Sequence, residues 1–230
     1  YLMCSYGSLS SAYNMRCGRS ERPEGPYLDV NGNPLVCSTD IGTGNKMLGS
    51  FRWEESPVDF FCPGHNDMFT TSRGVRLISY HCRTNYFIEK QLSRSNNFHY
   101  LYLAQYDFNS DGWPVMNPNR YAEEEIQDVT EEELLNITAG KFEAVLFTQG
   151  VTTVEAKRVV LHKDGTLDGA FKGAWKMYGS RYISIETQGD EFLGVVMPAW
   201  LDHQGIAGLT VTAMGKKSGM ALVMDSTNRI

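Results

Sequence analysis

The sequence predicts an all-β protein of 230 residues that is built in two parts. Short apolar runs recur along the chain, and clusters of Gly, Pro, Asn and Asp separate them, which is typical of β-strands joined by turns. One acidic stretch near the middle has a mild helical character, and the pattern of strands changes after it. We therefore expect a first domain over 1–122, a linker over 123–139 and a second domain over 140–230.

The first part opens directly with strand-like sequence. Tyr1–Tyr6 and Tyr13–Gly18 are predicted strands separated by a turn, so we expect further strands to precede them. Met68–Thr71 and Val75–Tyr80 are predicted to form a hairpin around the turn at 72–74. Tyr100–Phe108 is the next predicted strand, and the Asn-Ser-Asp-Gly sequence that follows it is a hairpin turn signal.

The acidic stretch Glu123–Leu135 is the only segment with helical character. Thr130 is followed three residues later by Glu133, the spacing of a capping box. We interpret the stretch as a solvated linker that contains one helical turn.

The second part consists of strand-like runs with Gly or Asp-Gly turns between them. Seven runs fall within about ninety residues, so a β-sandwich or a closed β-barrel is expected. The runs are Phe142–Phe147, Val151–Leu161, Gly173–Met177, Arg181–Thr187, Glu191–Met197, Leu209–Ala213 and Met220–Asp225.

Composition excludes several classes of partner. The net charge of −6 and the pI near 5.4 argue against nucleic acid or an anionic membrane as the main partner. No apolar run approaches the length of a membrane-spanning helix. Aromatic residues make up 12% of the chain, which suits a neutral ligand such as a sugar, because aromatic faces pack on its C–H surfaces.

Five cysteines are present, an odd number without CxxC spacing, which argues against a zinc site or a disulfide framework. We expect buried free thiols, and the pattern leaves a single disulfide open.

Motifs in three segments, taken together, resemble the endo-α-1,5-L-arabinanase group of glycoside hydrolase family 43. The order and spacing of these motifs carry the resemblance, and the region after Asn136 resembles the β-sandwich appended to the larger arabinanases. The motifs are Tyr1-Leu2-Met3-Cys4-Ser5-Tyr6-Gly7 with Gly25-Pro26-Tyr27, then Pro63-Gly64-His65-Asn66-Asp67, and finally Gly112-Trp113-Pro114-Val115 with Arg120-Tyr121-Ala122.

The resemblance implies a partial five-bladed β-propeller, of which this chain supplies about the last two blades, followed by a β-sandwich or barrel domain. It implies inverting hydrolysis of arabinan or arabino-oligosaccharides, which needs two carboxyl groups about 6.5–9.5 Å apart. On this reading the catalytic carboxylates precede Tyr1, so the chain contains no catalytic residue and is inactive alone. A complementary N-terminal propeller fragment is the expected partner, and the expected location is extracellular or periplasmic.

The resemblance also implies roles for individual residues. His65 is expected on the propeller axis, where it binds calcium or another cation directly or through water; the alternative is a histidine that only bonds backbone in a tight turn. Ser5 and Gly7 are expected to border the sugar. His81 and Arg83 alternate to one face of a strand and either line the axial channel or pack between blades.

Acidic residues within the chain do not indicate a catalytic pair of their own. Asp59, Asp67, Asp107 and Asp111 have no spacing that marks a dyad, and Asp111 lies in a turn sequence. Asp67 stands where the family pattern has Ser, and Tyr102 where it has Arg, so the substrate specificity stays open. A non-catalytic carbohydrate-binding or scaffold protein with the same fold is the alternative function.

Overall fold

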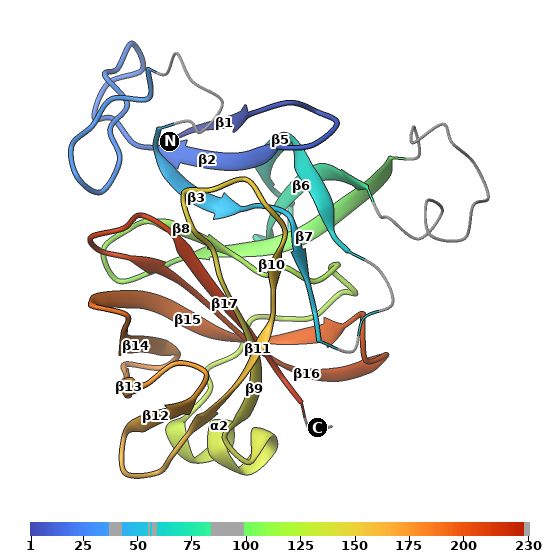
Figure 1. Cartoon of the computed structure of the whole chain (residues 1–230), viewed down its shortest axis with the longest axis vertical. Coiled ribbons are helices and arrows are strands. Elements are labelled where there is room, and N and C mark those ends of the chain that lie inside the picture. Colours follow the sequence, from blue (N-terminus) through green and yellow to red (C-terminus); the bar gives the residue numbers. More distant parts are fainter. Residues whose placement is uncertain (37–42, 55, 57–58, 84–98, 228–230) are drawn as a thin grey trace.

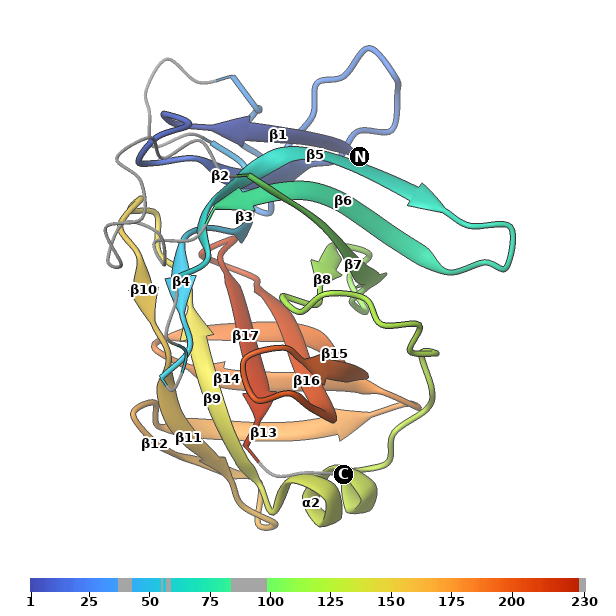
Figure 2. The ribbon, with the colours of Figure 1, turned by 90° about the vertical axis from the view of Figure 1, so that its right-hand side faces the viewer.

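The computed structural model describes residues 1–36, 43–54, 56, 59–83 and 99–227. The fold is all-β, as the sequence predicts, and it has two regions (Figure 1). Two small antiparallel sheets lie at one end of the molecule, and a closed barrel lies beneath them (Figure 2).

The first small sheet has the order β1-β2-β3 and contains β1 (Leu2–Tyr6), β2 (Asn14–Gly18) and β3 (Asn45–Leu48). The first two strands match the sequence prediction. The β1–β2 connection turns at Gly7, which has a φ of +85°, and a side chain there would collide with the carbonyl of Ala12. Glycine is therefore required at this turn.

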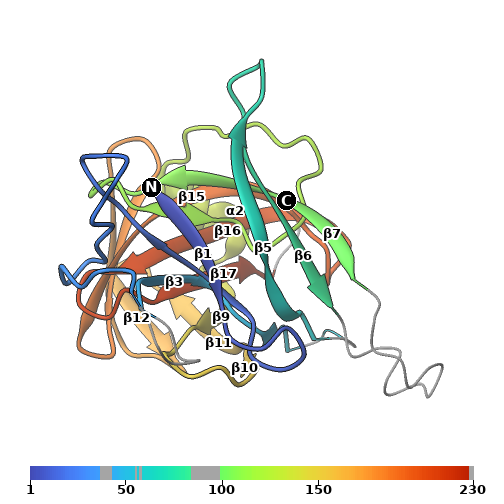
Figure 3. The same cartoon turned by 90° about the horizontal axis from the view of Figure 1, so that it is seen from above.

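The second small sheet has the order β5-β6-β7-β8. Its strands are β5 (Phe61–Thr70), β6 (Arg76–Arg83), β7 (Tyr100–Phe108) and β8 (Pro114–Met116). The predicted hairpin is confirmed, and both of its strands are longer than expected; the pair projects past the rest of the sheet when the molecule is seen from above (Figure 3).

The segment 63–67, which contains the turn-like Gly-His-Asn sequence, is a bulged part of β5. The pairing with β6 shifts register between Phe61 and Gly64 and again between Gly64 and Asp67. Cys62 and His65 have φ values of 53° and 54°, the left-handed conformation that a bulge imposes on its extra residue. The turn-like Gly-His-Asn sequence thus bends a strand without ending it.

The second region is a closed eight-stranded barrel among the described strands, not a β-sandwich. Neighbouring strands are antiparallel, and β9 closes the ring by pairing with both β11 and β17, two strands far apart in sequence. The strands are β9 (Lys141–Leu146), β11 (Lys157–Leu161), β12 (Thr166–Gly169), β13 (Gly173–Tyr178), β14 (Tyr182–Thr187), β15 (Asp190–Leu201), β16 (Ile206–Gly215) and β17 (Ala221–Ser226).

Helix α2 (Glu131–Thr138) lies at the end of the barrel farthest from the sheets (Figure 2). The predicted capping box is present: the Thr130 hydroxyl accepts from the Glu133 N–H at 3.1 Å, and the Glu133 carboxylate accepts from the Thr130 N–H at 2.8 Å. Leu134 is fully buried and packs into the apolar interior of the barrel. Part of the linker therefore covers one end of the barrel.

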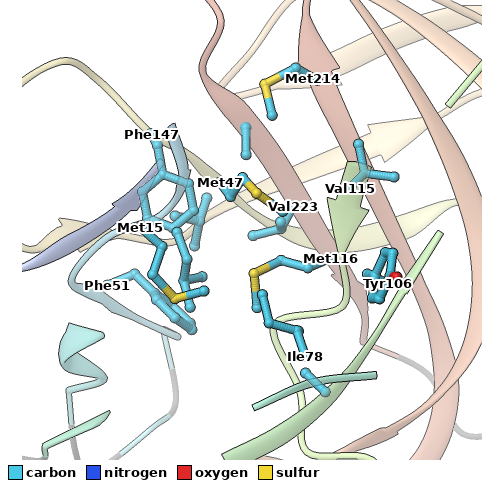
Figure 4. Packing of buried hydrophobic residues seen from close by; sticks show 14 of the residues in the cluster. Met15, Met47, Phe51, Ile78, Tyr106, Val115, Met116, Phe147, Met214 and Val223 are labelled. Atoms are coloured by element: carbon cyan, nitrogen blue, oxygen red, sulfur yellow. The ribbon is translucent and has the colours of Figure 1, made fainter. Parts of the chain in front are cut away.

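One hydrophobic core spans the boundary between the sheets and the barrel (Figure 4). Met15 and Phe51 from the sheet region pack in it with Met214 and Val223 from the barrel, and each of these four is at least 99% buried. Burial of such a side chain stabilises the fold by roughly 1.5–3 kcal/mol. A short parallel pair, β4 (Phe51–Arg52) with β10 (Val154–Glu155), joins the backbones of the two regions.

An ion-pair cluster around a buried carboxylate also joins the regions. The Asp107 carboxylate on β7 accepts from the Arg181 guanidinium of the barrel at 2.8 and 3.0 Å, and it pairs with Arg76 on β6. Its side chain is only 3% exposed. Asp107 therefore has a structural role at this boundary.

The described cysteines Cys4, Cys17, Cys62 and Cys82 are free thiols; three are buried, as expected, whereas Cys4 is half-buried, and Cys37 lies outside the described residues. Within the part of the chain that the structure describes, no helix has the length and apolarity to cross a membrane.

Candidate functional site

The candidate site lies where β1 meets the bulge of β5. The Ser5 hydroxyl on β1 accepts from the backbone N–H of His65 at 2.9 Å and donates to the side-chain oxygen of Asn66 at 3.2 Å. Ser5 therefore fixes the bulge that turns His65 outward. Gly64 is required beside it, because a Cβ there would lie less than 3.0 Å from ring carbons of Tyr13.

Three imidazoles gather around this bulge. His65 is exposed, and its ring centre lies 6.1 Å from that of the half-buried His81 on β6. His81 stacks on Tyr13 at 5.7 Å between ring centres, with an interplanar angle of 23°. The Nδ1 atoms of His81 and His99 lie 3.0 Å apart, so one imidazole donates a hydrogen bond to the other.

The electrostatics keep His81 uncharged at neutral pH. Burial lowers the pKa of His81 below its ordinary value, and the neighbouring His99, His65 and Arg83 lower it further because positive charges repel. A neutral imidazole both donates and accepts a hydrogen bond, so His81 can contact a hydroxyl group in either role.

Arg83 and Gly7 lie at the back of this site. The Arg83 guanidinium is buried; it donates to the backbone carbonyl of Leu9 at 3.2 Å and lies over the ring of Phe61 at 5.9 Å. It therefore anchors the β1–β2 loop, in which Gly7 forms the turn. The structure brings Ser5, His65 and His81 together at the surface, with Arg83 and Gly7 supporting the loop beside them.

Two residues of the site were not expected from the sequence. Tyr13 supports His81 by stacking, and His99 bonds to it across the β6–β7 pair. The pairing of His99 with His81 depends on strand register, which sequence spacing alone does not provide.

The acidic residues do not converge on this site. Asp59 pairs with Arg52, Asp107 is held between two guanidiniums, and Asp111 is an exposed turn residue. Asp67 is exposed two residues after His65. Within the described ranges no three His, Cys, Asp or Glu side chains are arranged to hold a metal ion. The arrangement can bind and orient hydroxyl groups, but it provides no facing carboxyl pair.

A second polar cluster is buried between the sheets and the barrel. The His203 imidazole stacks on Trp53 at 4.8 Å and lies 4.0 Å from the Glu143 carboxylate and 3.8 Å from the Asp225 carboxylate. Burial raises the pKa of Asp225 to about 7 and lowers the pKa of His203 to about 4. These side chains are at most 3% exposed, so a polymer cannot reach them.

Comparison with known proteins identifies the family. Residues 1–114 match glycosyl hydrolases family 43, and residues 118–224 match the C-terminal lipocalin-like domain of that family. The extracellular endo-α-(1→5)-L-arabinanase 2 of Bacillus subtilis is 28% identical over 87% of this chain and 44% of its own length. The extracellular endo-α-(1→5)-L-arabinanase of Thermotoga petrophila is 30% identical over 87% of this chain and 44% of its own length.

The fold agrees with these matches. A crystal structure of a family 43 glycoside hydrolase from Bacillus licheniformis superposes with a TM-score of 0.86 at 27% identity, over 98% of this chain and 52% of that one. The chain thus spans about half the length of the relatives that it matches. With family 43 sequence over its sheets and the family's C-terminal domain over its barrel, the chain belongs to glycosyl hydrolase family 43.

Proposed function

We propose that this chain is the C-terminal portion of a hydrolase that cleaves α-1,5-linked L-arabinan with inversion of configuration. The observation that carries the proposal is the Ser5–His65 bulge, which presents an imidazole and polar neighbours at the sheet surface without a carboxyl pair. The similarity to two proteins named as endo-α-(1→5)-L-arabinanases supports arabinan as the substrate.

We assign the domains accordingly. The sheets within 1–122 correspond to the last two blades of a five-bladed propeller, 123–139 is the linker, and 140–230 is the C-terminal domain. Two small antiparallel sheets that pack beside each other, with β1 next to β5, support this assignment (Figures 1 and 2). The names of both relatives include the word extracellular, which supports an extracellular or periplasmic location.

The acid and the base come from a complementary N-terminal portion in this proposal. Inverting hydrolysis needs one carboxylic acid to protonate the leaving oxygen and one carboxylate to activate water, at about 6.5–9.5 Å. Among the described acidic residues, Asp67 is exposed near the site, whereas Asp59 and Asp107 are held in ion pairs away from it. Ser5, His65 and His81 would then form one wall of the substrate site and contact sugar hydroxyls.

His65 is also the residue that we propose contributes to a cation site, with calcium as the expected ion. Calcium takes about 6–8 oxygen ligands, whereas His65 offers one nitrogen and the described residues form no three-ligand group around it. The described residues of this chain therefore do not fit a complete calcium site, and no step of the hydrolysis is derived through the cation.

The experiment compares this chain alone with a longer protein in which the upstream portion is present. We expect reducing ends to be released from linear α-1,5-arabinan only by the longer protein, with the inverted anomer seen first by NMR. His65→Ala in the longer protein should lower the rate and weaken calcium binding measured by calorimetry. A longer protein that binds arabinan and releases no sugar would favour the alternative, a non-catalytic binding or scaffold protein.

A further inference from the structure

We propose that this chain has a second carbohydrate site, at the seam between the second sheet and the barrel. The cavity at this seam has a volume of about 460 Å³. We call it the seam pocket; its lining consists of Ser56, Phe60, Tyr100, Leu101, Tyr102, Arg120, Asp202 and His203. Its size falls within the about 300–1,000 Å³ of small-molecule sites.

The seam pocket is separate from the candidate site around His65. Tyr102 pairs with Tyr80 across the β6–β7 ladder, and Leu101 pairs with His81. Successive residues of a strand point to opposite faces of a sheet. Tyr80 and Tyr102 therefore share one face of the sheet, and His81 and Leu101 lie on the other face. The aromatic wall of the seam pocket belongs to the Tyr102 face, and of the pocket residues on β7 Leu101 alone belongs to the His81 face.

Aromatic rings form one wall of the seam pocket. Tyr102 stacks on Tyr80 at 5.5 Å between ring centres with an interplanar angle of 19°, and it meets Phe60 edge-on at 5.5 Å. These contacts hold Tyr102 in place before a ligand arrives. Tyr100 lies two residues earlier on the strand and is 38% exposed. Such rings bind the C–H faces of sugars without the entropy cost of ordering long side chains.

A fixed ion pair forms the polar part of the pocket. Arg120 Nη2 donates to Asp202 at 2.9 Å, and the Arg120 backbone N–H donates to the same carboxylate at 3.3 Å. The Arg120 side chain is 59% exposed and that of Asp202 is 20% exposed, so both keep contact with solvent. The pair offers donors and acceptors side by side, which suits the vicinal hydroxyl groups of a sugar.

The chemistry favours a neutral oligosaccharide over a charged ligand. The charges of Arg120 and Asp202 cancel, and the rest of the lining is aromatic and apolar apart from Ser56 and the buried imidazole of His203. Burial raises the pKa of Tyr102, so its phenol stays protonated as a hydrogen-bond donor. The choice of an arabino-oligosaccharide among neutral sugars rests on the proposed function. The pocket would hold a distant stretch of the same polymer while another stretch occupies the site around His65.

The test measures binding of linear α-1,5-arabinan to the full chain by affinity gel electrophoresis. Tyr100→Ala and Asp202→Asn should each weaken retardation about five- to tenfold, the loss expected for a central contact. Phe69→Ala is the matched control, because Phe69 is 39% exposed and lies toward the tip of the β5–β6 hairpin (Figure 3). It should bind as the parent does, and thermal unfolding checks that each variant is folded.

Titration of the ¹⁵N-labelled chain with arabinotriose locates the contact. Shifts at 100–102 and 202 that disappear in Tyr100→Ala support the seam pocket. Shifts confined to Ser5 and His65, no shifts at all, or equal retardation of all variants would overturn it. Hydrolysis by the longer protein is measured separately. If arabinan does not bind at the seam pocket, the proposed function still stands, and if the longer protein is inactive, the binding result at the seam pocket can still be interpreted.

Discussion

Gly64→Ala tests the packing that supports the candidate site. The added Cβ would lie less than 3.0 Å from two ring carbons of Tyr13 and 3.0 Å from the Ser5 hydroxyl oxygen. Real Cβ atoms essentially never approach other heavy atoms that closely. The Tyr13 ring must therefore move, and because it stacks on His81, the imidazole loses its support.

The expected cost follows from the overlap. Inserting one carbon into a well-packed region costs about 1–3 kcal/mol, and the half-buried Tyr13 has some freedom to rotate, so we expect about 1–2 kcal/mol at this site. Urea unfolding followed by fluorescence measures the loss as a lower midpoint with an unchanged slope. NMR titration of His81 provides a local readout, since displacement of the stack changes its burial and raises its lowered pKa toward the ordinary value.

A matched control and a double mutant decide the cause. At Gly150 the nearest atom to an added Cβ is 3.5 Å away, and its φ is not in the left-handed region, so Gly150→Ala should leave the free energy of unfolding within about 0.5 kcal/mol of the parent. Gly64→Ala combined with Tyr13→Ala should cost less than the sum of the two single changes. An unperturbed His81 and strictly additive costs would refute the proposed role of this packing.

Three further changes test other parts of the fold. Asp107→Asn should lower the free energy of unfolding in urea by about 2 kcal/mol. This is less than the about 3–5 kcal/mol lost when a fully buried pair is broken, because solvent reaches both arginines. The exposed control Asp111→Asn should be neutral, and equal midpoints for the two variants would contradict the ion-pair cluster. Thr130→Ala should cost about 1 kcal/mol through loss of the helix cap, and an unchanged unfolding midpoint would contradict it. Burial raises the pKa of Asp225 from 3.8 to about 7, so its contribution to stability is present below pH 3.8 and is lost as the pH rises through 7. The unfolding free energy of Asp225→Asn relative to the parent should therefore rise between pH 4 and 8, and a flat difference would contradict this. Burial lowers the pKa of His203 to about 4, so His203 makes the unfolding free energy of both proteins rise between pH 4 and 6.5, and this contribution is common to both.

Local sequence chemistry predicted much of the fold. Alternation and turn residues identified β7 with both of its ends, and the Thr130–Glu133 spacing identified the helix cap. These features depend on residues within a few positions of one another. The closure of the barrel depends on the pairing of β9 with both β11 and β17. Local patterns do not reveal such long-range pairing, so a sandwich and a barrel were equally compatible with the sequence.

The candidate site was predicted less completely for the same reason. Resemblance indicated His65, Ser5 and His81, but the bulge that exposes His65 requires a left-handed backbone at a non-glycine residue, which sequence patterns rarely reveal. The His81–His99 bond depends on strand register, and Trp53 and His203 meet only because the sheet packs on the barrel. Such contacts join residues that are distant along the chain.

In the proposed function this chain supplies a wall of an arabinan site, and the acid and the base lie outside it. The most direct measurement is the release of reducing ends from linear α-1,5-arabinan by the purified 230-residue chain, with the longer protein as the positive control. We expect no release above the enzyme-free rate from the chain and clear release from the longer protein. Sustained hydrolysis by the 230 residues alone would contradict it.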